Sequence, residues 1–380
     1  MVGITADPSV PVGVWNQSSF EGRSVSFMPL FRLENDNVRH LVPTTLRYAL
    51  ALSRQHFKSD FFHFHRIEPA LAAGSWQGHK TLFIHNDIRQ QMASQTGEKT
   101  ILWRYFPAAY FSFEKRIINQ FDRILSCNSE AATLYQDNYP NLADRISVIR
   151  NTVDEDRFYP WTPEQKSLEH QRFTQKHQLP ANTRFILFAG RLHPQKDPLL
   201  LIQSFAELRD PQLHLLIAGE GELVEEVKSA IHRLKLGKQV TLLGAMQQTE
   251  LANLHRLVDV FILTSVYEGL PLVVLEALAC GTPVVTTRCG ETPRLLSPQS
   301  GVVSQERTPQ SIASALRQVL DHPKQYSQEQ CLQSAFPYNA KKVIQQVFLD
   351  MLNYHQQQNL PVIPNPSLEP GVPSRQNSRF

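Results

Sequence analysis

Apolar residues form short runs separated by segments with helical spacing along most of the chain. In the second half the runs are continuous rather than alternating, which is typical of strands buried on both faces of a parallel sheet. Strands are expected over residues 185–188, 213–218, 240–243, 260–263 and 284–286. The spacing predicts helices over residues 197–208, 222–234, 249–256, 270–279, 309–320 and 339–354. This alternation predicts a doubly wound α/β domain.

The first half shows the same alternation less regularly. Strands are expected over residues 24–31, 60–65, 80–84, 122–127 and 146–149. Helices are expected over residues 42–54, 101–120 and 129–135. Residues 1–20, which contain Pro8 and Pro11, are interpreted as loop. We therefore expect a second parallel α/β unit ahead of the clearer one.

Shifts in composition divide the chain further. A polar stretch with several prolines separates the two halves, and a run of prolines near the end cannot form a packed core. We expect an N-terminal Rossmann-like domain over residues 1–150, a linker over 151–182, a C-terminal domain over 183–335, a helix over 336–357 that packs back on the N-terminal domain, and a disordered tail over 358–380.

Composition and charge exclude several classes of protein. Hydrophobic residues make up 42% of the chain, which is enough to build cores, and the formal net charge of +3 does not indicate a nucleic-acid binder. The 4 cysteines have no metal-binding or disulfide-framework spacing, which favours a reducing compartment. The sequence shows no apolar run of about 18 residues and no signal-peptide pattern. We expect a cytoplasmic protein, with peripheral membrane contact left open.

The segment Y-E-G-L-P-L-V-V-L-E-A-L-A-C-G carries two carboxylates eight positions apart. Glu268 precedes Gly269 at a strand-to-helix turn, and Glu276 follows about two helical turns later. Ligands bind at the carboxyl ends of strands in open α/β sheets, and a helix N-terminus there attracts phosphate. A lone Glu usually solvates a helix face, but the apolar neighbours of Glu276 disfavour that interpretation.

The segment F-A-G-R-L-H-P-Q-K-D-P places two cations after a strand. Arg191 and Lys196 follow Gly190 before the next helix, and such a pair suits a diphosphate. Cations at strand ends are often structural. Because both segments belong to the same edge of one sheet, the diphosphate site is the better interpretation.

Four motifs in order resemble the donor half of family 4 retaining glycosyltransferases. They are G-R-L-H-P-Q-K-D-P, I-A-G-E-G-E-L, a G-x5-E-L segment over residues 244–251, and the E-x7-E block. V-I-R-N-T-V-D resembles the family's P-N-G-V-D segment, with Arg150 and Thr152 replacing Pro and Gly. The resemblance implies a GT-B fold, in which two Rossmann-like domains face a cleft.

The resemblance also implies roles for single residues. Donor binding is expected at Gly190, Arg191, Lys196, Glu268, Gly269, Leu270 and Glu276. Arg191 and Lys196 would neutralise the diphosphate, and Glu276 would bind the ribose hydroxyls. Glu268, with the backbone of the next two residues, would orient the sugar hydroxyls.

In the first half the resemblance is looser. The segment F-I-H-N-D matches the family's strand that ends in H-D, so His85 is expected beside the reacting sugar as a catalytic residue with Glu268. From the sequence alone, a core imidazole is the plainer interpretation of His85. The cluster His63, His65, Arg66 and Glu68 is expected to line the acceptor side, with metal ligation less favoured. Ser129 and Glu130 also match a family position.

Together these features predict a retaining glycosyltransferase. It would move a sugar from a nucleotide-diphospho-sugar to a hydroxyl of a polysaccharide, glycolipid or other glycoconjugate, with no cofactor and no metal. Two alternatives remain: a nucleotide-sugar-binding protein with weak or no catalysis, and a sugar-nucleotide epimerase. A nicotinamide dehydrogenase is poorly supported, because no G-x-G-x-x-G fingerprint follows a strand.

The start of the chain departs from the resembled pattern. Family members open with a strand, a Gly-rich loop and a long helix, which residues 1–20 do not show. The strand near residues 24–30 fits the family's third strand instead. We therefore expect an incomplete N-terminal sheet with an exposed edge, and weak catalysis unless a partner or upstream segment supplies the unit.

Overall fold

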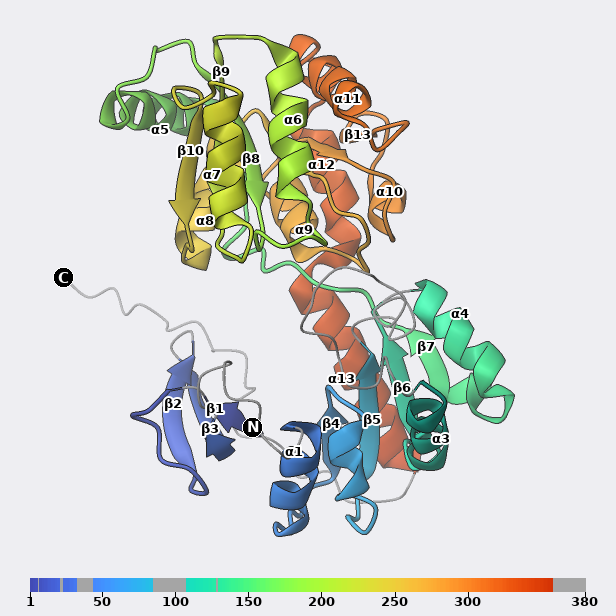
Figure 1. Cartoon of the computed structure of the whole chain (residues 1–380). Coiled ribbons are helices and arrows are strands. Elements are labelled where there is room, and N and C mark those ends of the chain that lie inside the picture. Colours follow the sequence, from blue (N-terminus) through green and yellow to red (C-terminus); the bar gives the residue numbers. More distant parts are fainter. Residues whose placement is uncertain (6, 21–22, 33–43, 85–106, 128, 358–380) are drawn as a thin grey trace, which may run out of the picture.

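The computed structural model describes residues 1–5, 7–20, 23–32, 44–84, 107–127 and 129–357. Figure 1 shows two domains, one above the other, with α13 running from their junction down along the lower one. Both contain parallel sheets flanked by helices, so the expected α/β fold class is confirmed. No helix in the described ranges is both long and apolar enough to cross a membrane.

The C-terminal domain is built on a six-stranded parallel sheet in the order β10-β9-β8-β11-β12-β13. Its strands are β8 (Arg184–Ala189), β9 (Leu213–Ala218), β10 (Val240–Gly244), β11 (Val260–Leu263), β12 (Val284–Thr286) and β13 (Gly301–Val303). The sequence predicted all except β13. Both faces of the sheet are covered by apolar clusters, which explains why the strand sequences are continuously hydrophobic.

The helices of this domain include five at predicted positions and two, over residues 292–295 and 328–335, that the sequence did not predict. They are α6 (Pro198–Leu208), α7 (Val224–Arg233), α8 (Gln248–Leu257), α9 (Leu272–Ala279), α10 (Thr292–Leu295), α11 (Pro309–Asp321) and α12 (Gln328–Ala335). The segment expected to be a linker contains α5 (Pro163–Lys176), which begins with a capping box between Thr162 and Gln165. Lys166 Nζ donates to the Val258 carbonyl at 2.8 Å, so α5 packs on the C-terminal domain.

The main part of the N-terminal domain is a four-stranded parallel sheet in the order β4-β5-β6-β7. Its strands are β4 (Phe61–Phe64), β5 (His79–Ile84), β6 (Arg123–Ser126) and β7 (Ile146–Val148), all at predicted positions. Its helices are α1 (Thr44–Ser53), α3 (Pro107–Ile118) and α4 (Ser129–Asn138), with short 3-10 turns η1 (Glu68–Leu71) and η3 (Pro140–Arg145). One apolar cluster lies beneath this sheet.

The prediction that residues 1–20 form only loop is wrong. They contain β1 (Val2–Thr5) and β2 (Asn16–Phe20), which pair with opposite edges of β3 (Arg23–Arg32). β1 runs parallel to β3, whereas β2 and β3 form an antiparallel hairpin. The prolines that suggested a loop lie between β1 and β2 and leave both strands intact. Within the described ranges this three-stranded sheet is separate from the four-stranded one.

The chain passes between the domains twice, and the two passages are bonded to each other. Val153 N donates to Tyr338 O at 2.9 Å, and Ala340 N donates to Val153 O at 3.1 Å. Beyond this point α13 (Ala340–Gln357), which follows η4 (Phe336–Tyr338), descends along the N-terminal domain (Figure 1). The Arg123–Asp350 ion pair, at 3.4 Å, fixes it to β6.

Candidate functional site

Three loops meet at the carboxyl ends of β8, β9 and β10. Gly190 N donates to Ala218 O at 3.0 Å, Leu192 N to Glu220 O at 2.8 Å, and Gly219 N donates to the carbonyl of Gly244 at 2.7 Å. A Cβ at Gly219, where φ is +140°, would lie 1.9 Å from the Gly190 carbonyl oxygen. The glycines of I-A-G-E-G-E-L therefore serve close packing between loops, which holds the β8–α6 loop in place.

Lys196 and Glu268 come together at this edge of the sheet. Lys196 Nζ lies 2.5 Å from Glu268 Oε1, and Ser265 Oγ donates to the same oxygen at 2.6 Å. Glu268 is only 8% exposed, so the carboxylate is held by two donors in a largely dry setting. No described residue donates a hydrogen bond to Glu268 Oε2. The arrangement leaves that oxygen and two ammonium protons available to a ligand.

The turn that follows Glu268 is fixed through its carbonyl groups. Glu291 N donates to Gly269 O at 3.0 Å, and Asn151 Nδ2 donates to Leu270 O at 2.8 Å. Within the described ranges the N–H groups of Gly269 and Leu270 donate no hydrogen bond. They precede the N-terminus of α9, whose dipole favours an anion. Expected backbone donors are thus present beside Lys196.

Glu276 lies on α9 and faces a histidine that the sequence analysis missed. His255 on α8 is fully buried, and its Nε2 lies 3.7 Å from Glu276 Oε2. Neither ring nitrogen nor Glu276 Oε2 has a hydrogen-bond partner, although all three atoms are buried. The missed signal is a histidine in an otherwise apolar helical stripe, opposite the helix that carries the E-x7-E block. Glu276 is therefore a buried carboxylate beside an imidazole, not a solvated surface residue.

Arg191 differs from Lys196 in being exposed and unpaired. Its backbone carbonyl accepts from His193 N at 2.9 Å, but its side chain makes no hydrogen bond or ion pair with another described residue. Lys196, in contrast, lies over Gly190, where an added Cβ would be 3.6 Å from Lys196 Cε. One cation of the expected clamp is thus held in place, and the other is free to meet an anion.

The two domains touch beside this turn. Ser129 N donates to Glu291 Oε1 at 3.1 Å, and the Ser129 hydroxyl donates to the same oxygen. Arg294 Nη1 donates to Ser129 Oγ at 3.0 Å and pairs with Glu291. Burial alone would raise the pKa of Glu291, but the Ser129 hydrogen bonds and Arg294 outweigh it and lower that pKa below its ordinary value. Ser129 was predicted as a site residue. Its predicted neighbour Glu130 is exposed.

The structure describes only some of the residues predicted to line the acceptor side. His85 lies outside the described residues, as does the side chain of Glu68. His63 and His65 both contact Phe83, and the His65 ring stacks on it at 4.9 Å between centroids. Burial lowers the pKa of both histidines. Among the described residues no group of three His, Cys, Asp or Glu side chains could hold a metal ion.

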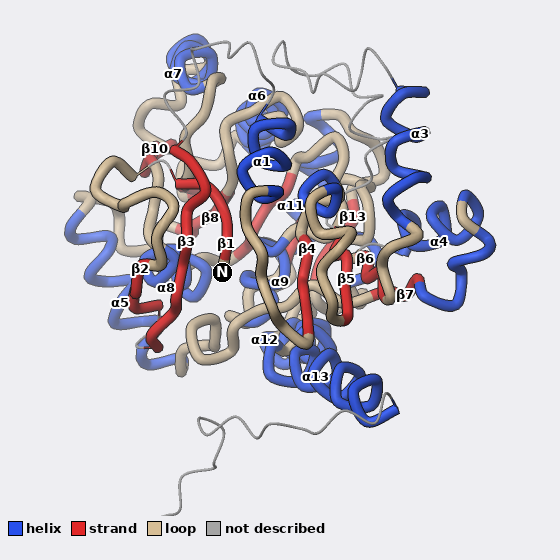
Figure 2. Tube along the Cα trace, turned by 90° about the horizontal axis from the view of Figure 1, so that it is seen from below, coloured by secondary structure: helices blue, strands red, loops and turns tan. Residues whose placement is uncertain are grey.

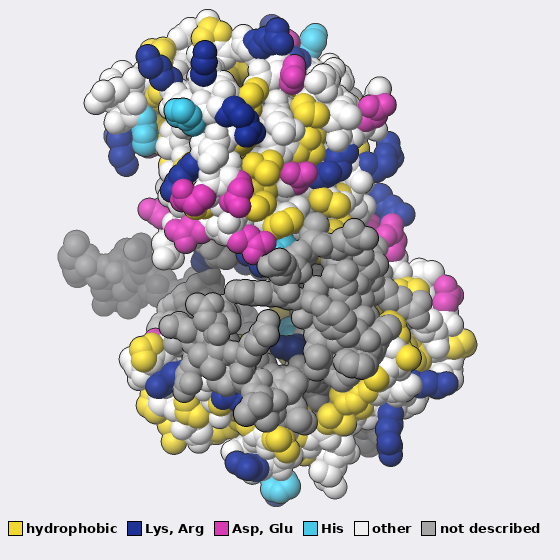
Figure 3. Space-filling view, viewed as in Figure 1, with side chains coloured by type: hydrophobic (Ala, Val, Ile, Leu, Met, Phe, Trp, Pro, Cys, Tyr) yellow, Lys and Arg dark blue, Asp and Glu magenta, His cyan; other side chains and the backbone are white. Residues whose placement is uncertain are grey.

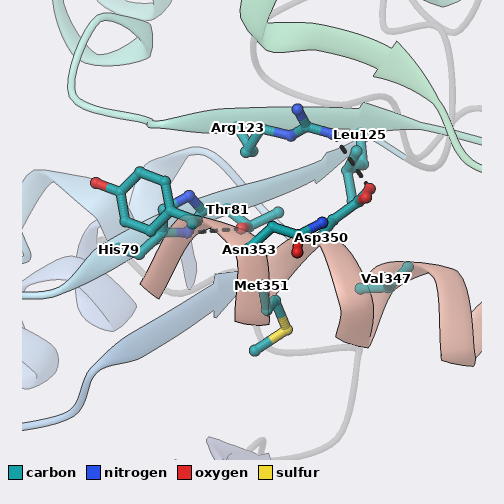
Figure 4. A pocket seen from close by; sticks show the side chains of 9 residues that line it. His79, Thr81, Arg123, Leu125, Val347, Asp350, Met351 and Asn353 are labelled. Carbon is teal, nitrogen blue, oxygen red and sulfur yellow. Dashed lines mark hydrogen bonds and ion pairs between the residues drawn. The ribbon is translucent and has the colours of Figure 1, made fainter. Parts of the chain in front are cut away.

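A cavity of about 200 Å³ in the N-terminal domain lies away from these residues. Figure 4 shows Arg123 and Asp350 facing each other across it, with His79 and Thr81 beside them. His79 and Arg123 begin β5 and β6, so the cavity is at the amino ends of these strands. The cavity therefore lies at the edge of the sheet opposite the carboxyl ends of its strands. It is a space left where α13 packs against the sheet.

Comparison with known proteins agrees with the sequence resemblance. Residues 169–342 match the family glycosyl transferases group 1. D-inositol 3-phosphate glycosyltransferase 2 of Catenulispora acidiphila is 30% identical over 230 residues, covering 57% of this chain and 52% of the relative. Mannosylfructose-phosphate synthase of Agrobacterium fabrum is 29% identical over 203 residues, covering 49% and 43%. The chain thus spans about half the length of these curated relatives.

Solved structures extend the likeness to both domains. Sucrose-phosphate synthase of Thermosynechococcus elongatus superposes with a TM-score of 0.73 at 19% identity, covering 94% of this chain and 88% of that one. Anabaena Alr3699/HepE in complex with UDP and glucose gives 0.67 at 18% identity, covering 88% and 86%. At such identities the likeness shows the fold, and the GT-B architecture expected from the sequence is confirmed.

Proposed function

We propose that this chain, a member of glycosyl transferases group 1 through residues 169–342, transfers a sugar from a nucleotide-diphospho-sugar to a hydroxyl acceptor with retention at the anomeric carbon. The observation that carries the proposal is the Lys196–Glu268–Ser265 cluster at the start of the α9 turn. It combines a cation for phosphate, an open carboxylate oxygen for sugar hydroxyls and free backbone donors.

The donor would lie across the carboxyl ends of the C-terminal sheet. Arg191 and Lys196 would bind the diphosphate, the first as a planar fork and the second as a point charge already oriented by Glu268. Glu276 would accept from the ribose hydroxyls. Glu268 Oε2 would accept from the transferred sugar. Because Gly190 has no side chain, the phosphates would have room beside the loop.

The reaction breaks the bond between the anomeric carbon and the β-phosphate oxygen. The departing diphosphate gains negative charge while the sugar becomes oxocarbenium-like, and Arg191, Lys196 and the α9 N-terminus would stabilise that charge. The acceptor hydroxyl forms the new bond from the same face of the ring. Its proton passes to the departing phosphate oxygen, so no protein nucleophile is needed. His85 would line the sugar from the other domain.

The cations on this chain would take over the charge neutralisation that a divalent ion provides elsewhere. We therefore propose a reaction without metal, and activity should survive added EDTA. A strict requirement for Mg²⁺ would contradict the scheme.

The acceptor would bind in the N-terminal domain. The visible face of the C-terminal domain carries acidic side chains along the edge nearest the other domain (Figure 3). The β9–α7 segment at that edge contributes exposed Glu220, Glu222, Glu225 and Glu226. A nucleic-acid strand would be repelled there, which favours a sugar or lipid-linked hydroxyl acceptor.

A second candidate is a protein that binds nucleotide-sugar without efficient turnover. It is favoured by the interruption between the two sheets of the N-terminal domain, which is the acceptor side. Both candidates predict the same donor site, so binding alone does not separate them. Release of nucleoside diphosphate by purified protein, with and without added acceptors, does.

The decisive first experiment is a thermal-shift panel of UDP-, GDP- and ADP-sugars. A ligand at ~100 times its Kd stabilises the folded protein by about 2.7 kcal/mol, which is readily measured. One base family should shift the unfolding temperature and the others should not. No shift with any nucleotide-sugar would contradict the proposed function.

A further inference from the structure

The sheet of the N-terminal domain is interrupted between β1 and β4. β1 is the edge of the three-stranded sheet and β4 the edge of the four-stranded one. Residues 1–4 and 61–66 line the same cavity, which has a volume of about 600 Å³. Figures 1 and 2 both show β1 and β3 on one side and β4 on the other. In the part of the chain that the structure describes, no strand lies between them.

The two sheets pack on one common core. Met28 and Leu30 of β3 share a single buried cluster with Phe64 of β4 and Leu82 of β5. The cavity, named here the β1–β4 slot, therefore lies between two sheet edges that share a core. An open row of backbone groups on either side of such a break is a binding template for another strand.

The walls of the slot are aromatic. Trp15 contacts Phe57 at 6.2 Å between centroids, and Phe57 and Phe62 contact Trp76 at 5.2 and 5.1 Å. All four side chains line the slot, and Trp15 is 53% exposed. Such walls suit apolar side chains on an inserted segment.

The backbone of β1 faces the slot with a polar group. Met1 O accepts from Met28 N of β3 at 2.9 Å, so the next carbonyl, that of Val2, points the other way. There the Tyr48 hydroxyl donates to Val2 O at 3.3 Å, a long bond from a side chain in the place of a strand partner. The slot thus combines apolar walls with a backbone acceptor at its edge, bonded only to a side chain.

We propose that the β1–β4 slot binds one extended strand, apolar on both faces, donated by a partner polypeptide. A strand pairs with both edges at once and joins the two sheets into one, whereas a lipid or small apolar ligand leaves both edges unpaired. Strands buried on both faces are continuously hydrophobic, which sets the chemistry of the donated segment. The proposal does not depend on the donor site, because none of the residues proposed to bind the nucleotide-sugar lines the slot.

The test uses the full chain and the synthetic peptide KKVIVLVIKK, with KKVIPLVIKK as its matched control. The central proline removes a donor and cannot continue a strand paired on both sides. Amide hydrogen exchange is followed at β1 and β4, with β9 of the other domain as internal reference. We expect the first peptide to slow exchange at β1 and β4 by about tenfold or more and to leave β9 unchanged, and the control to have no effect.

Two results would overturn the proposal. Equal exchange with and without the first peptide means that the slot does not accept a strand from outside, as when another segment of this chain fills it. Equal protection by dodecyl maltoside below its micellar concentration means that the slot is a site for apolar chains. Neither result bears on nucleotide-sugar binding, so this test and that of the proposed function fail separately.

Discussion

Glu268 and Glu276 occupy different chemical settings although one short motif contains both. Glu268 already accepts from Lys196 and Ser265, whereas Glu276 Oε2 is buried without a hydrogen bond. Because a buried acceptor without a partner is costly, Glu276 is poised to gain from a hydroxyl donor such as ribose. The two residues should therefore respond differently to removal of the carboxylate.

Glu276→Ala should weaken binding of the bare nucleoside diphosphate, whereas Glu268→Ala should spare it and remove the added affinity due to the sugar. Calorimetry with nucleoside diphosphate and with the matching nucleotide-sugar measures both. Identical losses in the two variants would contradict the assignment.

Arg191→Ala should weaken nucleoside diphosphate binding by roughly tenfold to a hundredfold, because a charged hydrogen bond contributes about 1.5–3 kcal/mol. Arg233→Ala is the matched control, since Arg233 is also exposed but lies at the far end of α7. Unchanged calorimetric affinity in Arg191→Ala would reject Arg191 as a phosphate ligand.

His255 should act through Glu276. His255→Phe keeps a buried ring but removes the nitrogen that faces the carboxylate, so we expect nucleoside diphosphate binding to weaken by about fivefold. In a Glu276→Ala background the same change should have no further effect. Additive losses in the double variant would show that His255 acts elsewhere.

Elements of the C-terminal domain were predictable because each strand and helix is bounded by its own pattern. Continuous apolar runs such as 213–218 marked buried strands, and Asp197, the N-cap of α6, marked a helix start. The strand β13, which begins with Gly301 and is held by pairing with β12, was missed because glycine is depleted in strands and only two apolar residues follow it. Likewise β1 is held by β3, a contact that no local pattern records.

The candidate site, like the fold, was predictable only where a local pattern marks its residues. The sequence identified Lys196 and Glu268 by motif, and the structure brings them together. It did not identify Ser265 or His255, because their roles depend on which helix and loop lie opposite. Three-dimensional packing, and not residue type, makes these two side chains part of the site.

His214 on β9 should make stability depend on pH. Burial lowers the pKa of His214 to about 4, and its Nε2 lies 2.8 Å from Thr241 Oγ1. The unfolded chain therefore binds more protons between pH 4 and the ordinary value of 6.5. The contribution of neutral His214 to the free energy of unfolding is fully present above about pH 6.5. It is lost as the pH falls toward 4. Chemical denaturation across this range should show a shallower pH dependence in His214→Gln than in the unchanged protein. An identical slope would contradict the assignment.

On the scale of the whole molecule, the contact of Ser129 with Glu291 and Arg294 holds the domains together beside the turn at Gly269. Glu291→Ala removes the carboxylate that bonds both Ser129 and Arg294. The domains should then separate more easily, which should raise the radius of gyration measured by X-ray scattering. The matched control is Glu130→Ala, one residue further along α4. The lowered pKa of Glu291 means that the contact persists at neutral pH and is lost as the pH falls below the ordinary carboxyl range. An unchanged radius in Glu291→Ala would show that other contacts hold the domains.

The bond between the two chain passages, at Val153 and Tyr338–Ala340, gives the molecule a single pivot. Separation of the domains then requires rotation about one short segment, with α13 moving together with the lower domain to which Arg123 ties it. Such rotations occur in microseconds to milliseconds, a range in which product escape often limits turnover. The turnover rate of this protein would then depend on residues 153 and 338–340, which are remote from the reacting atoms.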